Sequence, residues 1–473
     1  MDSSLDPTLL DRFAAIVGER HALRDAGDIE PYLTERRGLW HGQTRLVLRP
    51  GSVGEVSAIL KLATETNTPV VPQGGNTGLV GGQVPDGSGR EIVLSLSRLN
   101  RIREIDPLSN TLTAEAGVIL ENLHRAADEV DRLFPLSLAS QGSAQIGGNL
   151  SSNAGGTGVL AYGNARELCL GVEVVLPTGE IFDDLRKLKK DNTGYDLKNL
   201  FVGAEGTLGV ITAAVLKLFP KPKGREVAWV GINTPGDALA LFSLASDRAG
   251  SGLTAFELMS ETLLGFAETH IPGTQRPLAD KWPWYVLMEI ASGRSAQDAR
   301  GLAEDILSAG LEREFAGDAV IAASLAQGAA FWAIREALSD AQRPEGASIK
   351  HDISVPVAAI PDFIERAGKA VVGVSPDARV ACFGHMGDGN LHYNISQPAG
   401  GDAKAFLALY RTMNGAVHDV VRALGGSISA EHGIGQLKRD ELLTFAPPTA
   451  IDLMRRVKAA FDPAGIMNPG KVI

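Results

Sequence analysis

Three glycine-rich segments, each next to a run of β-forming residues, restrict the folds open to this chain. The first is VPQGGNTGLVGGQVP (residues 71–85), after the strand-like TPVV. The second spans residues 137–167, and the third is VGAEGTLGVIT (residues 202–212). Glycine lets backbone N–H groups approach a ligand closely and form an anion-binding concavity. On its own, the first segment could equally be a tight connection without a ligand.

The second segment, SLASQGSAQIGGNLSSNAGGTGVLAYGNARE, is predicted to be a long loop rich in Gly, Ser and Asn with little to bury. Long loops without structure of their own are uncommon in compact domains unless they are functional. A disordered linker is the alternative, but the segment lies between strands of one domain and lacks the charge bias of a linker. Three such segments in one domain predict a dinucleotide-sized ligand held in an extended form.

Composition narrows the class of protein. The chain has 473 residues, 44% hydrophobic and 21% charged, which fits a globular protein of two or three domains. A formal net charge of −11 argues against a general nucleic-acid binder. Only Cys169 and Cys382 are present, so no disulfide framework can form and a reducing compartment is expected.

The N-terminus and the hydropathy pattern bear on location. Residues 1–25 read as an amphipathic helix with a Ser/Asp start, not as a secretory signal. No apolar run reaches the roughly 18 residues that a membrane-spanning helix needs. We therefore expect a cytoplasmic protein, with peripheral contact to a membrane left open.

The order of the elements predicts an α+β fold. From Gln43 to about Pro222, short β-rich runs alternate with turns and helices without a steady βαβ rhythm. The stretch PKPKGRE (residues 220–226) reads as a domain junction, followed by strands and an Ala/Leu-rich helical region. We expect an N-terminal helical segment (1–40), a ligand-binding domain (41–222) and a second α+β domain (223–473).

The stretch GHMGDGNLHYN (residues 384–394) carries two histidines around an Asp-Gly pair. Asp388-Gly389 is a signal for a two-residue type I′ hairpin. That turn would pair His385 with His392 on one face of the strands, with Cβ atoms about 4.5–5.5 Å apart. Two imidazoles so placed suit one metal ion. Taken alone, such a pair is more often a surface or satisfied core feature.

A second motif, ISAEHGIG, supplies an acid beside another histidine. Glu431 would be the third metal ligand, and His432 would stay available as a base. Two histidines and one carboxylate leave open positions for a substrate, as in catalytic metal sites. This motif is also ambiguous by itself, and the two motifs support each other.

The glycine-rich segments PQGGNTG, IGGNLSSNAGG and GAEGTLGVIT resemble the FAD-binding domain of the vanillyl-alcohol-oxidase (PCMH-type) flavoprotein family. In that family the first two hold the pyrophosphate and ribityl chain, and the third lies by the adenine and isoalloxazine ends. Neither of the first two contains the His or Cys that attaches flavin covalently in some members, so noncovalent FAD is implied. Cys169, beyond the loop, reads as a core residue. The implied FAD contacts are Pro72, Gly74, Gly75, Asn76, Thr77, Gly78, Gly82, Gln83, Leu136, Gly142, Ser143, Ile146, Gly147, Gly148, Asn149, Ser152, Asn153, Gly155, Gly156, Glu205, Gly206, Gly209, Ile211 and Asn468.

The C-terminal motifs FGHMGDGNLHYN and GSISAEHGIGQLKR resemble the C-terminal domain of FAD-linked 2-hydroxyacid dehydrogenases, and the resemblance continues to FDPAGIMNPGKVI. In that family the two histidines and the glutamate bind a divalent metal, usually zinc, and the following histidine is the base. The resemblance therefore implies a metal on His385, His392 and Glu431, with His432 as base. It also implies that an α+β FAD-linked-oxidase domain with a helical segment follows the FAD domain, and that its last residues return to the flavin.

The substrate is suggested by FWAIREALSD and ASIKHDISVP. From the residues alone, Arg335 beside Glu336 reads as a solvated helix face. The resemblance instead implies that Arg335, Ser339, Lys350, Asn394 and His432 bind substrate, as in the branch of the family that acts on D-2-hydroxyglutarate. Ser339 stands where that branch often has Thr. D-Lactate or another D-2-hydroxyacid is the alternative substrate.

The implied reaction oxidises the hydroxyacid to a 2-oxoacid. The substrate chelates the metal, His432 takes the hydroxyl proton, and the Cα hydrogen leaves as hydride to flavin N5. A stepwise carbanion route is left open. The family implies an electron-transfer flavoprotein or a quinone-linked carrier as acceptor, and a homodimer is compatible with the sequence. A flavin oxidase that uses O₂ and a non-redox metal- or flavin-binding sensor are the alternative functions.

Overall fold

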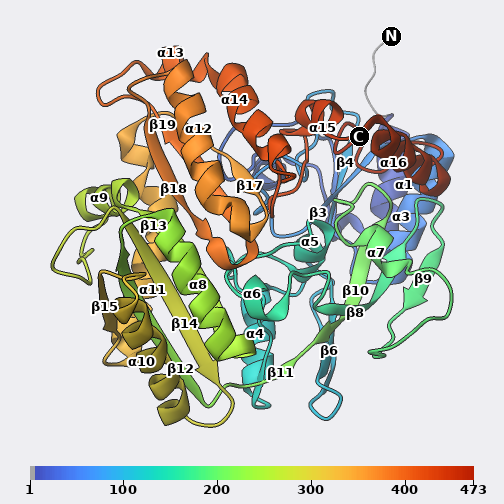
Figure 1. The fold of residues 1–473 in the computed structure, drawn as a ribbon. Coiled ribbons are helices and arrows are strands. Elements are labelled where there is room, and N and C mark those ends of the chain that lie inside the picture. The colour runs from blue at the N-terminus through green and yellow to red at the C-terminus, as the bar shows by residue number, and fades with distance from the viewer. Residues whose placement is uncertain (1–5) are drawn as a thin grey trace. The chain divides into compact units, whose positions relative to one another are not determined.

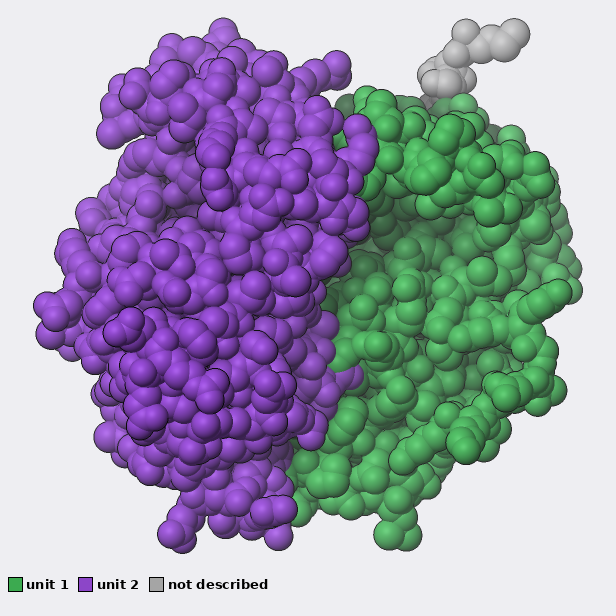
Figure 2. Space-filling model, viewed as in Figure 1, with its two compact units in different colours: residues 1–155, 163–221, 431–473 green, residues 156–162, 222–430 purple. Residues whose placement is uncertain are grey.

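The computed structural model describes residues 6–473, so Ser3 and Ser4 of the predicted helix start lie outside the described residues. The chain forms two compact units (Figure 2). Unit 1 comprises residues 1–155, 163–221 and 431–473. Unit 2 comprises residues 156–162 and 222–430. The chain therefore enters unit 2 twice, the first time for one short helix.

Unit 1 is built on three small sheets. One has the order β1-β2-β4-β3, the second β5-β6-β10-β8-β9, and the third pairs β11 with β7 (Figure 1). The strands are β1 (Ala22–Leu23), β2 (Val47–Leu48), β3 (Val70–Gln73), β4 (Ile92–Ser95), β5 (Ile102–Asp106), β6 (Thr111–Glu115), β7 (Arg132–Leu133), β8 (Cys169–Val175), β9 (Ile181–Asp184), β10 (Val210–Lys217) and β11 (Phe219–Pro220).

The helices of unit 1 follow local signals in the sequence. The predicted N-terminal helix forms over residues 7–17, a shorter span than the predicted residues 1–25, since a 3₁₀ turn and β1 follow it. It begins after Asp6, whose side chain accepts from the Thr8 N–H. Ser52 caps the helix at residues 53–66, which buries one stripe of apolar side chains and ends at Asn67 in the left-handed conformation. The helices are α1 (Pro7–Val17), α2 (Ala26–Ile29), α3 (Val53–Thr66), α4 (Leu120–Asp128), α5 (Ile146–Ser151), α7 (Lys198–Phe201), α15 (Arg439–Phe445) and α16 (Pro448–Phe461).

Unit 2 is built on one large sheet with the order β15-β12-β14-β13-β18-β19-β16, and β17 also pairs with β19. Its longest pairing joins β12 to β14 over nine residues in antiparallel register, from Gly224 opposite Ser292 to Ile232 opposite Trp284. The strands are β12 (Gly224–Ile232), β13 (Leu253–Ser260), β14 (Trp284–Ser292), β15 (Asp318–Ile321), β16 (Ser348–Ile349), β17 (Asp352–Ser354), β18 (Arg379–His385) and β19 (Asn390–Ser396).

Helices cover this sheet. The helices of unit 2 are α6 (Val159–Tyr162), α8 (Pro235–Ala249), α9 (Glu261–His270), α10 (Ala296–Glu312), α11 (Leu325–Ala341), α12 (Ile360–Val374), α13 (Ala403–Leu407) and α14 (Tyr410–Ala423). Helices α9 and α11 pack together and share a buried cluster with side chains of one sheet face, among them Trp229, Tyr285 and Phe383. That face also carries the candidate residues described below.

The expected α+β class is confirmed, because both units mix helices with mainly antiparallel sheets. The expectation of a structureless loop at residues 137–167 is wrong. The segment contains α5 and α6, and α5 forms where Ile146 and Leu150 lie one helical turn apart and are fully buried. Cys169 is a buried residue of β8, as predicted. Among the described residues, the helices are all too short or too polar to cross a membrane.

Candidate active site

Unit 1 contains a cavity of about 300 Å³ where the three glycine-rich segments meet. Glu431 and His432 line the same cavity. The predicted FAD contacts in its wall are Pro72, Gly74, Gly75, Asn76, Thr77, Gly78, Gly82, Gln83, Gly147, Gly148, Asn149, Ser152, Gly155, Glu205, Gly206, Gly209 and Ile211.

The remaining predicted FAD contacts do not line this cavity. Leu136 and Ile146 are buried core residues, and Gly156 belongs to unit 2. The others are Gly142, Ser143, Asn153 and Asn468.

Twelve residues of the cavity wall were not predicted from the sequence. They are Arg36, Gln73, Leu79, Val80, Leu96, Leu138, Ala139, Ser140, Gln145, Ser151, Ala154 and Val210. Several of these adjoin a predicted residue, whereas Arg36 and Leu96 come from segments without a glycine motif.

Glycine is required where the first two segments touch. A Cβ on Gly75 would lie 2.0 Å from the Ser143 carbonyl oxygen. A Cβ on Gly147 would lie 2.6 Å from the Ala116 side chain. Gly75 therefore sets the spacing between the first two segments, whereas Gly147 lets the second segment approach Ala116, which directly follows β6.

Four non-glycine residues near the cavity adopt the left-handed conformation: Asn76, Asn153, Glu205 and Asn468, with φ between 45° and 52°. Such positions cost free energy and persist only where surrounding contacts fix them. For Asn76 the contacts are clear, because its Nδ2 donates to the Thr34 carbonyl at 2.9 Å. The fold around the cavity therefore holds these four backbones in an otherwise unfavourable conformation.

The cavity suits the polar part of an FAD molecule. Gln145 Oε1 and Asn149 Oδ1 are buried acceptors without a hydrogen-bond partner among the described residues, and both side chains line the wall. Buried polar atoms normally have a partner, and FAD carries hydroxyl and N–H donors that could supply one. A Cβ on Gly148 would meet nothing within 4 Å, so the wall is open at that point.

Glu205 ties the third glycine segment to the EHG motif. Its carboxylate accepts from the N–H of Ile434 at 2.7 Å and from the N–H of Gly435 at 2.8 Å. Burial raises the pKa of the Glu205 carboxyl, and these N–H groups and the Lys438 charge offset only part of that rise. Glu205 thus holds the backbone that follows His432, a role that no local motif indicates.

The C-terminal segment lies on the first glycine segment. Asn468 Nδ2 donates to the carbonyls of Gly82 (2.9 Å) and Glu205 (2.8 Å), and its N–H donates to the Val70 carbonyl. Lys458 Nζ donates to the Thr207 and Met467 carbonyls, each at 2.7 Å. Asn468 therefore joins two walls of the cavity.

In unit 2 the histidine hairpin differs from the predicted register. His392 lies opposite Phe383, and the cross-strand partner of His385 is Glu257 on β13. The prediction of a two-residue turn is wrong. Residues 386–388 form a 3₁₀ turn, and Gly389 follows it in the left-handed conformation. The two imidazole rings still lie close, with centroids 5.7 Å apart.

A buried carboxylate links His385 to Arg335. His385 Nδ1 donates to Glu257 Oε1 at 2.7 Å, and Arg335 Nε donates to Glu257 Oε2 at 2.8 Å. Burial would raise the pKa of the Glu257 carboxyl, but the charges of His385 and Arg335 together lower it to about 2. Phe383 packs its ring 4.8 Å from the Arg335 guanidinium and 4.8 Å from the His392 ring.

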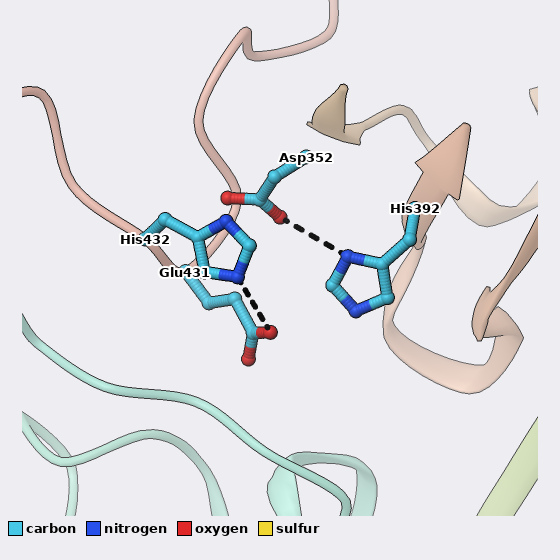
Figure 3. Close-up of side chains that lie close together, drawn as sticks. All are labelled: Asp352, His392, Glu431 and His432. Atoms are coloured by element: carbon cyan, nitrogen blue, oxygen red, sulfur yellow. Dashed lines mark ion pairs between the residues drawn. The ribbon is translucent and has the colours of Figure 1, made fainter. Parts of the chain in front are cut away.

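Carboxylates and imidazoles gather where β17 pairs with β19. Asp352 and His392 are cross-strand partners, and Asp352 Oδ1 lies 3.9 Å from His392 Nδ1. The Ala430 N–H donates to the Asp352 carbonyl, and the chain continues directly into Glu431 and His432. Glu431 Oε1 lies 3.6 Å from His432 Nε2. Figure 3 draws the four acidic and imidazole side chains, a group that could hold a metal ion.

Oxygen and nitrogen donors of these types suit zinc or a similar divalent ion. The group contains the predicted ligands His392 and Glu431 and the predicted base His432. His385 is outside it. Asp352 was not predicted, because it comes opposite His392 only through pairing of strands that are distant in the sequence.

The predicted substrate residues all belong to unit 2 except His432. Arg335 is 6% exposed, so the alternative of a solvated helix face is wrong for this residue. Ser339, one turn further along α11, is exposed, and Lys350 is half-buried between β16 and β17. Asn394 is buried, and its Nδ2 donates to Gln342 Oε1 at 3.0 Å.

Comparisons with known proteins agree with this architecture. Residues 44–184 match the family described as FAD binding domain, and residues 221–472 match the family described as FAD linked oxidases, C-terminal domain. A solved structure of p-cresol methylhydroxylase with substrate bound has a TM-score of 0.77 with 16% identity, over 98% of this chain and 96% of that chain. This likeness shows a shared fold.

Two curated relatives are more similar in sequence. The mitochondrial D-2-hydroxyglutarate dehydrogenase of Danio rerio is 40% identical over 433 residues, which is 91% of this chain and 79% of the relative. The mitochondrial D-2-hydroxyglutarate dehydrogenase of Arabidopsis thaliana is 36% identical over 471 residues, which is 100% of this chain and 82% of the relative. The chain therefore belongs to the FAD-linked oxidases, within the group of FAD-dependent 2-hydroxyacid dehydrogenases.

Proposed function

We propose that this chain oxidises D-2-hydroxyglutarate to 2-oxoglutarate, with FAD held by the glycine-rich segments and a divalent metal ion, usually zinc in the family, held near the EHG motif. The main supporting observation is that Glu431 and His432 line the same cavity as the glycine-rich segments. This oxidation removes a proton from the C2 hydroxyl and a hydrogen with its electron pair from C2. The base must therefore reach the hydroxyl on C2, and the flavin must reach the hydrogen on the same carbon.

The residues have separate roles in this proposal. Bound FAD supplies the two-electron acceptor, and the bound metal supplies a Lewis acid for the hydroxyl and one carboxylate oxygen of the substrate. His385, His392 and Glu431 are the proposed metal ligands, as the family resemblance implies. His392 and Glu431 belong to the group that also contains Asp352, and the His385 ring lies 5.7 Å from the His392 ring. His432 accepts the hydroxyl proton, which suits an imidazole near neutral pH.

The second carboxylate of the substrate needs cationic and polar partners in a site shielded from water. Arg335, Ser339, Lys350 and Asn394 are proposed for this role. A guanidinium can bind a carboxylate through two parallel hydrogen bonds, which an ammonium cannot do. The position of Arg335 supports the proposal, because Glu257 and Phe383 hold its guanidinium in one place.

The test of the substrate is Arg335→Ala, assayed with an artificial dye acceptor on D-2-hydroxyglutarate and on D-lactate. Loss of a charged hydrogen-bonding partner should lower kcat/KM for the dicarboxylate by about 10- to 100-fold. The value for D-lactate should change far less, since D-lactate has no second carboxylate. Arg335→Lys keeps a positive charge beside Glu257 and should give an intermediate loss. Equal losses on both substrates would contradict a role in binding the distal carboxylate.

The flavin is proposed to be bound noncovalently, because the first two glycine-rich segments contain neither His nor Cys. Cys169 is buried in β8 and does not line the cavity. Acid precipitation should therefore release all of the absorbance near 450 nm into the supernatant. Yellow colour that stays with the pellet would disprove noncovalent binding.

The acceptor that reoxidises the flavin is proposed to be an electron-transfer flavoprotein or a quinone-linked carrier, as the family resemblance implies. A homodimer is a further prediction of the sequence reading. The dye-acceptor assay depends on neither, so it tests the substrate separately.

A further inference from the structure

We infer that Glu257 is a positioning residue that fixes His385 and Arg335 in one buried unit and so couples metal binding to recognition of the distal carboxylate. The inference rests on the proposed function and deepens it. Glu257 lies in the middle of β13 and is 1% exposed. Its neighbours in the sequence, AFELMS, contain no motif that points to this role.

The two oxygens of Glu257 are divided between the two partners. Oε1 accepts from His385 Nδ1, and since a carboxylate can only accept, Nδ1 must carry the proton. The lone pair of a neutral imidazole then belongs to Nε2, the atom that would bind a metal ion. A carboxylate that orients a metal-binding histidine in this way is a recurrent arrangement.

The other oxygen holds Arg335. Its Nε donates to Glu257 Oε2, and its Nη2 lies 2.6 Å from the same oxygen. Phe383 packs against the guanidinium plane and restricts its rotation. One carboxylate thus sets the direction of both side chains, and a shift of either would be transmitted to the other.

Register explains why Glu257 can do this. Its cross-strand partner on β18 is His385 itself, so the contact is fixed by the sheet ladder. Arg335 reaches the same point from α11, which packs on this face of the sheet. The arrangement therefore depends on two strands and a helix and involves no loop.

The test compares Glu257→Gln with a matched control, Glu289→Gln. Glu289 is also a buried glutamate of this sheet, bound to Thr254 and Trp332, but it contacts neither His385 nor Arg335. The amide introduced by Glu257→Gln has one oxygen and one NH2 group, so one of the two partners would face a donor in place of an acceptor. We expect the zinc affinity of the metal-depleted, FAD-containing protein, measured by chelator competition, to fall by about 10- to 100-fold in E257Q. KM for D-2-hydroxyglutarate should rise several-fold more than KM for D-lactate, and E289Q should change neither.

A second pair of variants serves as the control for misfolding. E257Q leaves Arg335 without a counter-charge, so R335M and the double variant R335M/E257Q are compared for zinc affinity and melting temperature. The double variant should bind zinc about 10- to 100-fold more weakly than R335M. Zinc affinity within about threefold of the respective parent in both pairs would overturn the inference.

The two hypotheses fail in different ways. A wild-type protein that binds zinc but does not prefer D-2-hydroxyglutarate over D-lactate refutes the proposed substrate, while the zinc comparison still decides the role of Glu257. A wild-type protein that binds no zinc, manganese or cobalt refutes the metal site and the inference together.

Discussion

Lys471 and Glu91 form a buried ion pair that helps to hold the C-terminal segment. Lys471 Nζ lies 3.3 Å from both carboxylate oxygens of Glu91, and each residue is 2% exposed. Burial raises the pKa of Glu91 and lowers the pKa of Lys471, and their attraction opposes both changes. Each charge is thus tolerated only because the other is present.

Replacing Lys471 by Met should destabilise the protein strongly. The variant leaves the Glu91 carboxylate buried without its cation, which typically costs about 3–5 kcal/mol in the free energy of unfolding. The measurement is urea unfolding at neutral pH, with Lys369→Met as control. Lys369 is an exposed partner of Glu365, and losing such a surface pair should cost about 1 kcal/mol or less.

The cost of Lys471→Met should depend on pH. The folded-state pKa of Glu91 is raised by burial, and without Lys471 only the hydrogen bond from the Asp86 N–H still lowers it. The folded state therefore takes up a proton before the unfolded state does as the pH falls. The destabilisation should be largest at neutral pH and should shrink as the pH approaches the ordinary glutamate value. Equal destabilisation at pH 7.5 and pH 5.5 would contradict this account.

At the same scale, sequence reasoning could find His392, Glu431 and His432 because each stands in a glycine-rich motif. It could not find Asp352 or Glu257, whose partners are set by strand pairing and whose neighbours in the sequence carry no local pattern. Glu205 was predicted as an FAD contact, but its hydrogen bonds to Ile434 and Gly435 join distant segments and could not be predicted.

At the scale of elements, the glycine-rich segments divide into glycines that the backbone needs and glycines that keep the cavity open. Gly75 belongs to the first kind, since a Cβ there would overlap the Ser143 carbonyl. Gly148 belongs to the second kind. It lies within α5, lines the cavity, and a Cβ there would meet no other atom within 4 Å.

Gly148→Leu should therefore separate folding from flavin binding. Leucine is a better helix former than glycine by roughly 0.5–1 kcal/mol, so the melting temperature of the flavin-free protein should stay the same or rise. FAD affinity, measured by fluorescence titration, should fall at least tenfold because the side chain enters the cavity. Gly265→Leu in α9 also has open space around it and should leave FAD affinity unchanged. Wild-type FAD affinity in Gly148→Leu would show that FAD does not occupy this cavity.

The elements themselves were largely predictable, for physical reasons. Runs of β-branched residues such as VITAAVLK form strands, and capped amphipathic stretches such as residues 53–66 form helices. The histidine hairpin was predicted, but its register was not, because Asp388 accepts from the Asn390 N–H and the turn is longer than two residues. In residues 137–167 the many glycines concealed the buried pair Ile146 and Leu150.

At the scale of the whole molecule, unit 1 is assembled from three separate stretches of chain. The last stretch joins it through a bridge between Val70 and Met467 and through Lys458, which donates to carbonyls on both sides. No local sequence pattern specifies such a return. The family resemblance led to an expectation that the chain end lies by the flavin, whereas hydrophobic periodicity gives no information about it.

The proposed cofactors use different side chains, and this predicts that they can be removed separately. The glycine-rich segments offer backbone and amide groups to FAD, whereas the metal would be held by carboxylates and imidazoles. Dialysis against a strong chelator should abolish at least about 99% of D-2-hydroxyglutarate oxidation, because the Lewis acid is worth several kcal/mol in the transition state. The absorbance near 450 nm should remain, and added Zn²⁺ or Mn²⁺ should restore activity. The control is the same chelator saturated with zinc, which should leave activity intact. Full activity in protein that elemental analysis shows to be free of divalent metal would refute a catalytic metal, while FAD lost together with the metal would show that the two sites are linked.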